Sequence, residues 1–418
     1  MPSQPTRYGS SRRVVVTGLG AVSSLGLGAH ELIDSVRYGR HGIGPAEQFD
    51  TAGFERTLAG EVRGFEPGVH LRHTAPERWG RSGQFAAVAA RFAAEDAGLA
   101  GTADDGRDGL GAHRGVSVFG TTNGESQEVE RAVAQSVERG PGAMDPALLG
   151  RTSPGNIAGA AAAELGLTGE ALTFGTACAA GNYAVGYAYD LISSGEADLA
   201  VCGGADASNR ATHAGFHALG ALAESVPRPF DEHRDGIVTA EGGAALVLEP
   251  LDAAVARGAR IYAEVLGHGM TCDARHMTNP HAGTIAACVR AAHERAGITP
   301  ADVDYICAHG TGTRANDITE VTAVREVFGD ALPPISSIKS MLGHTMGAAA
   351  AFGALVSCAA LHEGFLPPSA TLRAVDPELG EVDVVPGVGR DASPRIVQNH
   401  GFAFGGNNAV VLFGKAGV

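Results

Sequence analysis

Short apolar runs alternate along the chain with longer, alanine-rich stretches that carry polar residues at intervals. The runs at 14–18 and 115–120 have the length and β-branched content of buried strands. The stretch 83–98 has helical spacing of apolar positions and ends at a glycine, which predicts a helix. The segments ALTFGTAC, DLAVCGGAD and GGAALVLEP continue the strand pattern. Alternating β and α elements predict an α/β protein with largely parallel sheets.

The same alternation restarts after Glu249. Strands are expected in IYAEVLGHGM, DYICAHG and PISSI, and a final pair of strands in IVQNHGFAFGGNNAVVLF. Helices are expected over about 284–296, 316–328 and 348–361. We therefore predict two pseudo-duplicated halves, 1–250 and 251–418, on the element order alone. No low-complexity linker separates them, so we expect one shared core.

Composition narrows the class of protein. The 60 glycines of the 418 residues have no fixed period, which favours tight turns and close backbone approaches over linkers. The net charge of −15 argues against nucleic acid as a partner. None of the six cysteines forms a CxxC pair, which is typical of reduced thiols in a cytoplasmic protein. No apolar run reaches the ~18 residues of a membrane span, so no membrane partner is expected.

Two patterns partly match known binding motifs, one for a dinucleotide cofactor and one for zinc, but neither motif is complete. The glycines of GLGAVS (18–23) follow a strand, but the third glycine and the acidic residue of a dinucleotide fingerprint are absent, so we interpret them as a tight turn. A second group contains possible metal ligands at 268–281, whose spacing matches no usual zinc pattern: His268, Cys272, Asp273, His276 and His281. We predict neither a metal nor a cofactor.

Cys178 stands where the strand ALTFGTA meets a following helix. The free N–H groups and dipole of a helix N-terminus favour thiolate over thiol, and such a turn leaves N–H groups for an oxyanion. Most free cysteines are instead small buried hydrophobes. This motif alone leaves both interpretations open.

Three later segments carry further chemistry. His309 follows a strand and begins the loop HGTGT. From this motif alone, a core histidine with satisfied hydrogen bonds is as plausible as a functional one. Lys339 and His344 lie in KSMLGH; because a lysine is costly to bury unpaired, we expect a polar network around it. Near the end, GFAFGGNN forms an apolar, glycine-rich loop before the last strand.

Together these motifs resemble the elongating β-ketoacyl-acyl carrier protein synthases of the thiolase superfamily. The cysteine elbow, HGTGT, KSMLGH, PFDEHRDG and GFAFGGNNA occur in the order of that family and span nearly the whole chain, from about Val14 to Phe413. The resemblance implies a thiolase-like fold, with two βαβαβαββ halves in a layered αβαβα core. It also implies an acyltransferase that acts as a dimer.

The resemblance implies a role for each matching residue. Cys178 carries the acyl chain, and His309 and His344 bind the malonyl thioester carbonyl during decarboxylation. Lys339 holds this network and pairs with Glu320. The remaining roles are phosphopantetheine binding by Thr311 and Thr313, and gating by Phe404, whose N–H joins that of Cys178 in an oxyanion hole. Phosphopantetheine enters only as the arm of the carrier protein, so no resident cofactor is implied.

Two departures bear on the substrate. Asn123 stands where fatty-acid enzymes of this type carry an apolar residue of the acyl pocket, whereas Phe216 still resembles a pocket wall. A polar wall disfavours a long saturated chain, because its amide loses water without a sure partner. The segments TACAAGN and RAND resemble type II polyketide ketosynthases. We therefore predict polyketide or polyene extension, with fatty-acid elongation as the alternative.

The partners follow from the same resemblance. Acyl carrier proteins are acidic, so the docking face should be locally basic. The candidates are Arg72, Arg78 and Arg81, for which a solvated helix face is the plain alternative. The dimer is either a homodimer or a heterodimer with a chain-length-factor homologue. A non-catalytic chain-length factor lacks the cysteine that this chain has, and a thiolase uses a second cysteine as its base, so neither alternative is favoured.

Overall fold

The computed structural model describes residues 11–99 and 114–417. An eleven-stranded sheet runs through the described part of the chain in the order β12-β11-β15-β16-β10-β1-β9-β7-β5-β6, with β2 (Gly26–Leu27) paired to β1. The strands of the first half are β1 (Val14–Ser23), β5 (Gly115–Gly120), β6 (Ala171–Phe174), β7 (Leu199–Asp206) and β9 (Gly242–Pro250). Those of the second half are β10 (Ala263–Cys272), β11 (Tyr305–Cys307), β12 (Ile335–Ser336), β15 (Ile396–Phe402) and β16 (Asn407–Gly414).

The two groups of five strands repeat one topology. Numbered along the chain within each group, the spatial order from the outer edge inward is third, second, fourth, fifth, first in both. The two first strands, β1 and β10, pair antiparallel over three residues at the centre, from Val14 opposite Val265 to Val16 opposite Ala263. The predicted pseudo-duplication is confirmed by this shared order.

The prediction of largely parallel sheets was wrong. β5 runs parallel to β6 and β7, and β11 runs parallel to β12 and β15. The remaining pairs of the main path are antiparallel. The short loop between β15 and β16 explains one such pair, since a parallel pair needs a long crossover.

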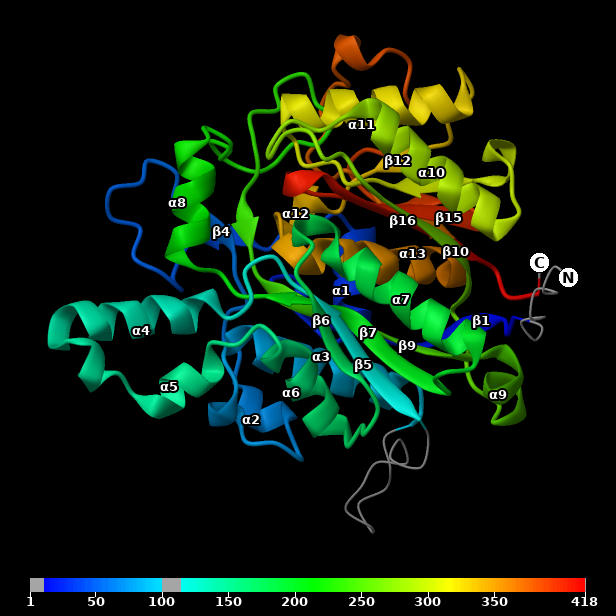
Figure 1. The fold of residues 1–418 in the computed structure, drawn as a ribbon. Coiled ribbons are helices and arrows are strands. Elements are labelled where there is room, and N and C mark those ends of the chain that lie inside the picture. The colour runs from blue at the N-terminus through cyan, green and yellow to red at the C-terminus, as the bar shows by residue number, and fades with distance from the viewer. Residues whose placement is uncertain (1–10, 100–113, 418) are drawn as a thin grey trace, which may run out of the picture.

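Helices form three layers around the sheet (Figure 1). α7 (Ala180–Ser194) and α13 (Ala349–Glu363) lie in the middle and contact strands of both halves. α3 (Arg81–Asp96) and α6 (Asn156–Leu165) cover the first half-sheet from outside. α10 (Ala282–Ala296) and α11 (Arg314–Phe328) form the third layer, where α10 packs on β10 and β16 and α11 packs on α10. This arrangement is the predicted αβαβα core.

The central helix α13 is buried on every side from Ala349 to Leu361. With the turn before it, the segment Met346–Glu363 is long and apolar enough to cross a membrane by length and composition, and 89% of it is buried inside the fold. Such burial is typical of a core helix. The sequence expectation concerned uninterrupted apolar runs and did not single out this segment, because Ser357, His362 and Glu363 interrupt it.

The glycines of GLGAVS serve helix packing rather than a turn. They lie inside β1, which continues to Ser23. A Cβ on Gly18 would stand 2.1 Å from the carbonyl oxygen of Ala93, and one on Gly20 would stand 2.0 Å from that of Ala89. α3 therefore packs directly on the strand backbone, and the predicted tight turn was wrong.

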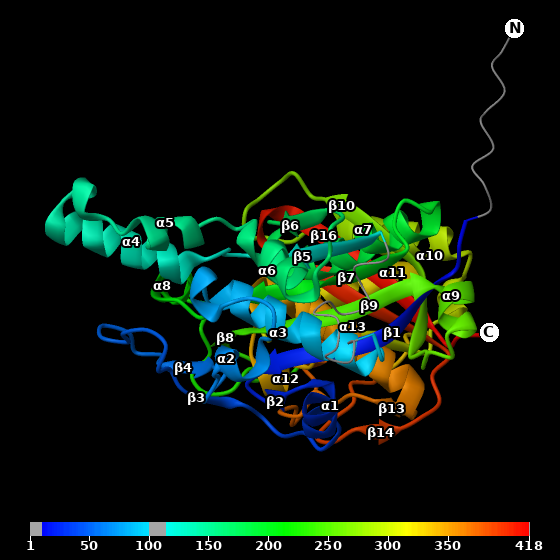
Figure 2. The ribbon, with the colours of Figure 1, turned by 90° about the horizontal axis from the view of Figure 1, so that it is seen from below.

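Smaller elements surround this core. The remaining helices are α1 (Ala29–Arg37), α2 (Pro67–His70), α4 (Ser126–Arg139), α5 (Pro146–Arg151), α8 (Arg210–Ala218), α9 (Leu251–Ala256) and α12 (Lys339–Leu342). Two small sheets are built from β3 (Ile43–Pro45), β4 (Leu58–Gly60) and β8 (Thr239–Ala240), and from β13 (Phe365–Leu366) and β14 (Arg390–Asp391). Figure 2 shows that α4 and α5 project from one side of the molecule. α4 exposes Val129, Val133 and Val137 there.

Candidate active site

Cys178 sits at a strained turn between β6 and α7. β6 ends at Phe174, a 3-10 turn covers Ala177–Ala179, and α7 begins at Ala180. Ala177 has a φ of 50°, in the left-handed region that residues with a Cβ rarely adopt. Strained backbone of this kind gathers at functional sites. The strand–turn–helix arrangement predicted around Cys178 is present.

The resting thiol is protonated. Burial raises the pKa of Cys178 to about 11, and the Lys339 charge only partly offsets this effect. The backbone N–H groups of Cys178 and Phe404 also contact the sulfur and lower its pKa. The pKa of the resting thiol stays raised because desolvation outweighs the two N–H groups and the Lys339 charge together.

One pocket collects the catalytic candidates from both halves. Its empty volume is about 620 Å³. Of the predicted site residues, it is lined by Cys178, Phe216, His309, Thr311, Thr313, His344 and Phe404. The first two belong to the first half and the others to the second. The thiol and the two histidines thus open into one space although they lie far apart in sequence.

Both histidines are held neutral, and their partners fix the proton positions. Burial and the nearby Lys339 charge lower the pKa of His309 and of His344 well below the ordinary value of 6.5. Nδ1 of His344 accepts the N–H of Met346 at 3.1 Å. Nδ1 of His309 lies 3.5 Å from the ammonium of Lys339. With both Nδ1 atoms facing donors, each ring carries its proton on Nε2 and is a hydrogen-bond donor there.

Lys339 and Glu320 act on His309 from two directions. Nζ of Lys339 donates to the carbonyl oxygen of His309 at 2.5 Å. Glu320 accepts the N–H of His309 and the N–H of Gly310, each at 2.8 Å. The predicted direct pair between Lys339 and Glu320 is thus replaced by contacts on either side of the histidine backbone. Burial lowers the pKa of Lys339, while the Glu320 charge raises it.

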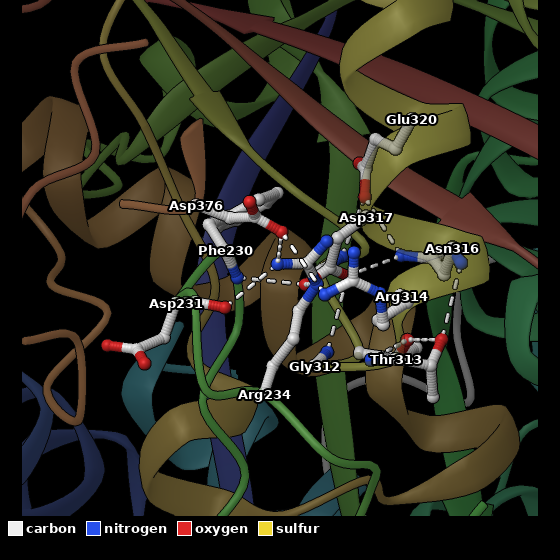
Figure 3. A network of polar contacts seen from close by, with 12 residues as sticks. Phe230, Asp231, Arg234, Gly312, Thr313, Arg314, Asn316, Asp317, Glu320 and Asp376 are labelled. Carbon is white, nitrogen blue, oxygen red and sulfur yellow. Dashed lines mark hydrogen bonds and ion pairs between the residues drawn. The ribbon is translucent and has the colours of Figure 1, made fainter. Parts of the chain in front are cut away.

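The motif PFDEHRDG supports the HGTGT loop (Figure 3). Arg234, from this motif, donates to Asp376 at 2.6 Å and lies 3.5 Å from Asp317. Asp317 in turn accepts the N–H groups of Phe230 at 2.8 Å and of Gly312 at 3.3 Å. These buried contacts fix the loop that carries Thr311 and Thr313, whose hydroxyls lie 2.9 Å apart.

Phe404 lines the pocket beside the ring of Phe216 and directly precedes two glycines. Its ring stacks on Phe216, with centroids 5.6 Å apart, and is 36% exposed. The following Gly405 and Gly406 both have a positive φ, near 80°. Glycine tolerates this conformation at no steric cost, which lets the backbone turn directly after Phe404.

Besides Lys339 and Glu320, which lie behind His309, four predicted residues lie outside the set that lines the pocket. Asn123 donates its N–H to Asp206, and its side-chain nitrogen is buried without a hydrogen-bond partner. Arg81 forms two hydrogen bonds to the fully buried Glu241, at 2.9 and 2.6 Å. Its guanidinium is therefore used inside the fold, and docking by Arg81 is not supported.

The other two arginines are exposed. Arg72 pairs with Glu95 at 3.0 Å, and Arg78 lies over the ring of Trp79.

Sequence reasoning missed two buried residues behind the pocket. Asp206, at the end of β7, accepts the N–H groups of Thr122, Asn123 and Gly347. His400, on β15, contacts Glu320 at 2.8 Å. An aspartate ending the apolar run LAVCGGAD was a usable signal for the first. A single histidine in a strand gave none for the second.

The possible metal ligands at 268–281 have separate local partners. Nε2 of His268 lies 3.2 Å from Asp190. Nδ1 of His276 accepts the N–H groups of Thr278 and Asn279, and His281 caps α10. Each histidine thus has a structural role of its own.

Comparisons with known proteins agree with this geometry. Residues 11–254 match the family profile "Beta-ketoacyl synthase, N-terminal domain", and residues 262–373 match "Beta-ketoacyl synthase, C-terminal domain". The chain is 36% identical to 3-oxoacyl-[acyl-carrier-protein] synthase 2 of Staphylococcus aureus (strain N315), covering 97% of this chain and 99% of that protein. The chain belongs to the β-ketoacyl synthase family and is an acyltransferase.

Two solved structures are similar over nearly the whole chain. One is described as "The ishigamide ketosynthase/chain length factor", with 49% identity, a TM-score of 0.93, and coverage of 97% of this chain and 100% of that one. The other is AntDE:AntF, a type II polyketide synthase acyl-carrier protein in complex with its ketosynthase. It has 30% identity, a TM-score of 0.86 and the same coverage.

Proposed function

We propose that Cys178, His309 and His344 carry out decarboxylative Claisen condensation in this pocket. The observation that carries the proposal is a buried thiol that shares one cavity with two neutral histidines, each with its proton on Nε2. A nucleophile and two oxyanion donors are the groups that this reaction needs.

The first half-reaction loads Cys178. Its sulfur attacks the thioester carbon of an acyl carrier protein, and the new C–S bond forms as the carrier C–S bond breaks. The proton lost by Cys178 ends on the departing carrier thiol, so no other reactant is needed. The N–H groups of Cys178 and Phe404 stabilise the negative oxygen of the intermediate.

The second half-reaction releases CO2. The bond from the malonyl carboxylate to its α-carbon breaks, and its electron pair forms an enolate whose oxygen accepts from His309 and His344. The enolate carbon attacks the acyl thioester, and the C–S bond to Cys178 breaks. The products are a β-ketoacyl carrier, CO2 and a Cys178 thiolate that takes a proton from water.

The surrounding residues have supporting roles. Lys339 and Glu320 fix the backbone of His309 from both sides. Phe404 gates the pocket, and Phe216 forms a wall for the acyl chain. Thr311 and Thr313 present hydroxyls to the phosphopantetheine arm, which belongs to the carrier substrate.

The cargo is proposed to be a polyketide or polyene chain. Support comes from 49% identity with the ishigamide ketosynthase/chain length factor, against 36% with the Staphylococcus aureus synthase. Asn123 contributes less than its sequence position suggests, because it lies outside the lining of the pocket. Turnover that favours saturated C12–C16 carriers, roughly the long acyl class, over short or unsaturated ones would support fatty-acid elongation instead.

The partner is proposed to be a homologous chain that covers α4. This helix projects from the molecule (Figure 2). Val129, Val133 and Val137 are exposed on it and, at a spacing of four residues, share one face. Relatives have been solved with a chain-length factor. Native mass spectrometry of the chain alone and of the chain coexpressed with such a homologue separates a homodimer from a heterodimer. A Val133→Glu variant should lose either one, because it places a charge in the contact.

Carrier docking is proposed for Arg78, in the cytoplasm, where acyl carrier substrates are available. Arg78→Glu should raise KM for a carrier-bound substrate and leave KM for a small thioester mimic unchanged. Arg395→Glu, which reverses another exposed arginine on the second half, is the matched control. Equal effects of Arg78→Glu on both substrates would exclude docking there.

The main proposal is tested by loading the site. After incubation with an acyl carrier protein, intact mass should show one acyl adduct, and peptide mapping should place it on Cys178. The exposed thiol of Cys272 is the other accessible candidate, so Cys272→Ser is the control variant. An adduct that is absent, or that disappears in Cys272→Ser, would contradict the proposal.

A further inference from the structure

A buried hydrogen-bonded chain runs from α10 to the turn of His309. Nε2 of His293 lies 2.6 Å from the side-chain oxygen of Gln398, and the side-chain nitrogen of Gln398 lies 2.5 Å from Nε2 of His400. Nδ1 of His400 lies 2.8 Å from Oε1 of Glu320. The same Oε1 accepts the N–H of His309. The chain thus ends on the backbone of a proposed catalytic histidine.

The strand places these groups in line. Gln398, His400 and Phe402 alternate along β15 and share one of its faces. Phe402 contacts both the ring of His400 and the ring of His309, at centroid distances of 4.9 and 6.0 Å. β15 is therefore linked to His309 in two ways. His400 reaches its backbone through Glu320, and Phe402 contacts its ring directly.

The donors along the chain follow from the amide of Gln398. Its oxygen can only accept, so His293 donates to it; its nitrogen can only donate, so Nε2 of His400 accepts. This leaves the proton of His400 on Nδ1, where it donates to Glu320. Each nitrogen of His400 therefore has one defined task.

We propose that His400 is a positioning residue, which orients Glu320 through Nδ1–H and thereby holds the His309–Gly310 turn that aims Nε2–H of His309 into the pocket. This inference rests on the proposed function. It assigns a role in condensation to a side chain that does not touch the substrate.

The electrostatics of Glu320 are consistent with that geometry. Burial raises the pKa of Glu320, but the hydrogen bond from His400, with the N–H groups of Gly310 and His309, outweighs burial and leaves the pKa below its ordinary value. A protonated Glu320 would have one oxygen turned into a donor and could not accept both backbone N–H groups. Its negative charge also supports the Lys339 ammonium, which donates to the His309 carbonyl.

Two variants separate the two nitrogens of His400. In His400→Asn the side-chain nitrogen can occupy the place of Nδ1 and keep the bond to Glu320. In His400→Gln the polar atoms lie one bond further out, near the place of Nε2, and the bond to Glu320 is lost. The two variants are otherwise matched, since both put a neutral amide at a fully enclosed position.

The half-reactions are measured separately on the full-length protein: loading of Cys178 by intact mass, and CO2 release from a malonyl carrier. His400→Gln should lower kcat for CO2 release by about 10–100-fold, the effect of a misplaced catalytic group, with KM and the loading rate within about threefold. His400→Asn should restore CO2 release to within about threefold of the wild type. A purely structural role would instead slow loading and CO2 release alike.

The inference would be overturned if His400→Gln and His400→Asn lost CO2 release equally, or if either variant lost loading and CO2 release equally. In both cases normal activity of the wild-type protein would still support the proposed function. If His400→Gln does not fold, His400→Leu serves in its place. It removes the bond between His400 and Glu320, so CO2 release should fall by roughly 10–100-fold without a change in loading. No change in that variant would also overturn the inference. A wild-type protein that neither loads Cys178 nor releases CO2 would overturn both the proposed function and the inference.

Discussion

The two halves contain the same strained turn but use it differently. In the first half, Thr176 precedes a 3-10 turn that starts at Ala177, with a φ of 50°, and leads into α7. In the second half, Thr345 precedes a 3-10 turn that starts at Met346, with a φ of 51°, and leads into α13. The middle residue is Cys178 in one turn and Gly347 in the other.

This difference shows that the turn is a property of the duplicated fold and that the chemistry belongs to one copy. Gly347 gives its N–H to Asp206, and a Cβ there would stand 2.4 Å from the carbonyl carbon of Thr121. The second turn therefore packs against the first half-sheet, and its N–H at Met346 holds the neighbouring His344, which lines the pocket.

The largest expected effects come from changing the two middle residues to alanine. Cys178→Ala should lower condensation by about 10³-fold or more, because no nucleophile remains. Its free energy of unfolding should change by less than about 1 kcal/mol. Gly347→Ala should lower the free energy of unfolding by about 1–3 kcal/mol, because the new Cβ meets backbone. Chemical denaturation and a condensation assay on both variants check the pair.

The comparison between the turns fails if Cys178→Ala destabilises the protein as much as Gly347→Ala does. In that case the first turn would also depend on the packing of its middle side chain. Retained Cys178 loading in Gly347→Ala would show that the two turns act independently.

A smaller effect is expected from the two histidines of the second half. His309→Ala or His344→Ala should each slow CO2 release by about 10²–10³-fold, since each removes one donor to the enolate oxygen. Loading of Cys178 should continue, because the oxyanion donors for that step are backbone N–H groups. Radiolabelled CO2 release and intact mass measure the two steps. Loss of loading in either variant would contradict this division of work between the halves.

The pH dependence of the thiol tests the electrostatics across the halves. Because burial raises the pKa of Cys178 to about 11, its alkylation by a small uncharged reagent should rise about tenfold per pH unit from pH 7 to 10. Lys339→Met should slow alkylation severalfold at pH 8, since the ammonium lowers the pKa of that thiol. A plateau reached near pH 8 in the wild type would show a thiolate already present in the resting site.

Sequence patterns predicted the duplicated element order because the spacing of apolar residues within each segment is enough to tell a strand from a helix. Strand direction was missed, since nothing local to β9 or β16 records whether its neighbour runs parallel. Cys178 and His309 each remained ambiguous as single motifs, and only their order with KSMLGH pointed to one site. His400 could not be found in this way, because its role depends on a contact with Glu320, eighty residues away.

Two buried carboxylates extend the comparison of the halves. Asp206 and Glu320 each accept backbone N–H groups beside the pocket. Burial raises the pKa of Asp206 to about 6, because the hydrogen bonds of Thr122, Asn123 and others only partly offset it. Burial acts on Glu320 as well, but His400 and the backbone N–H groups leave its pKa below the ordinary value. The histidine is the partner that Asp206 lacks.

The smallest expected effect is a difference in how stability depends on pH. A carboxyl whose pKa is raised in the folded state contributes stability that is fully present below its unfolded pKa and is lost as pH rises through its folded pKa. Asp206 therefore contributes progressively less between about pH 4 and 7, by on the order of 1–3 kcal/mol. The wild type should lose stability relative to Asp206→Asn over this window, measured by denaturant unfolding at each pH.

Glu320→Gln should show the opposite sign. A lowered pKa contributes stability that is present above the unfolded pKa of about 4.5 and is lost as pH falls through the folded pKa. The wild type should therefore hold a constant advantage over Glu320→Gln above that pH and lose it below. The same dependence of unfolding free energy on pH for both carboxylates would contradict a special effect of His400 on Glu320. The His309–Gly310 turn would then depend only on the backbone N–H groups that Glu320 accepts.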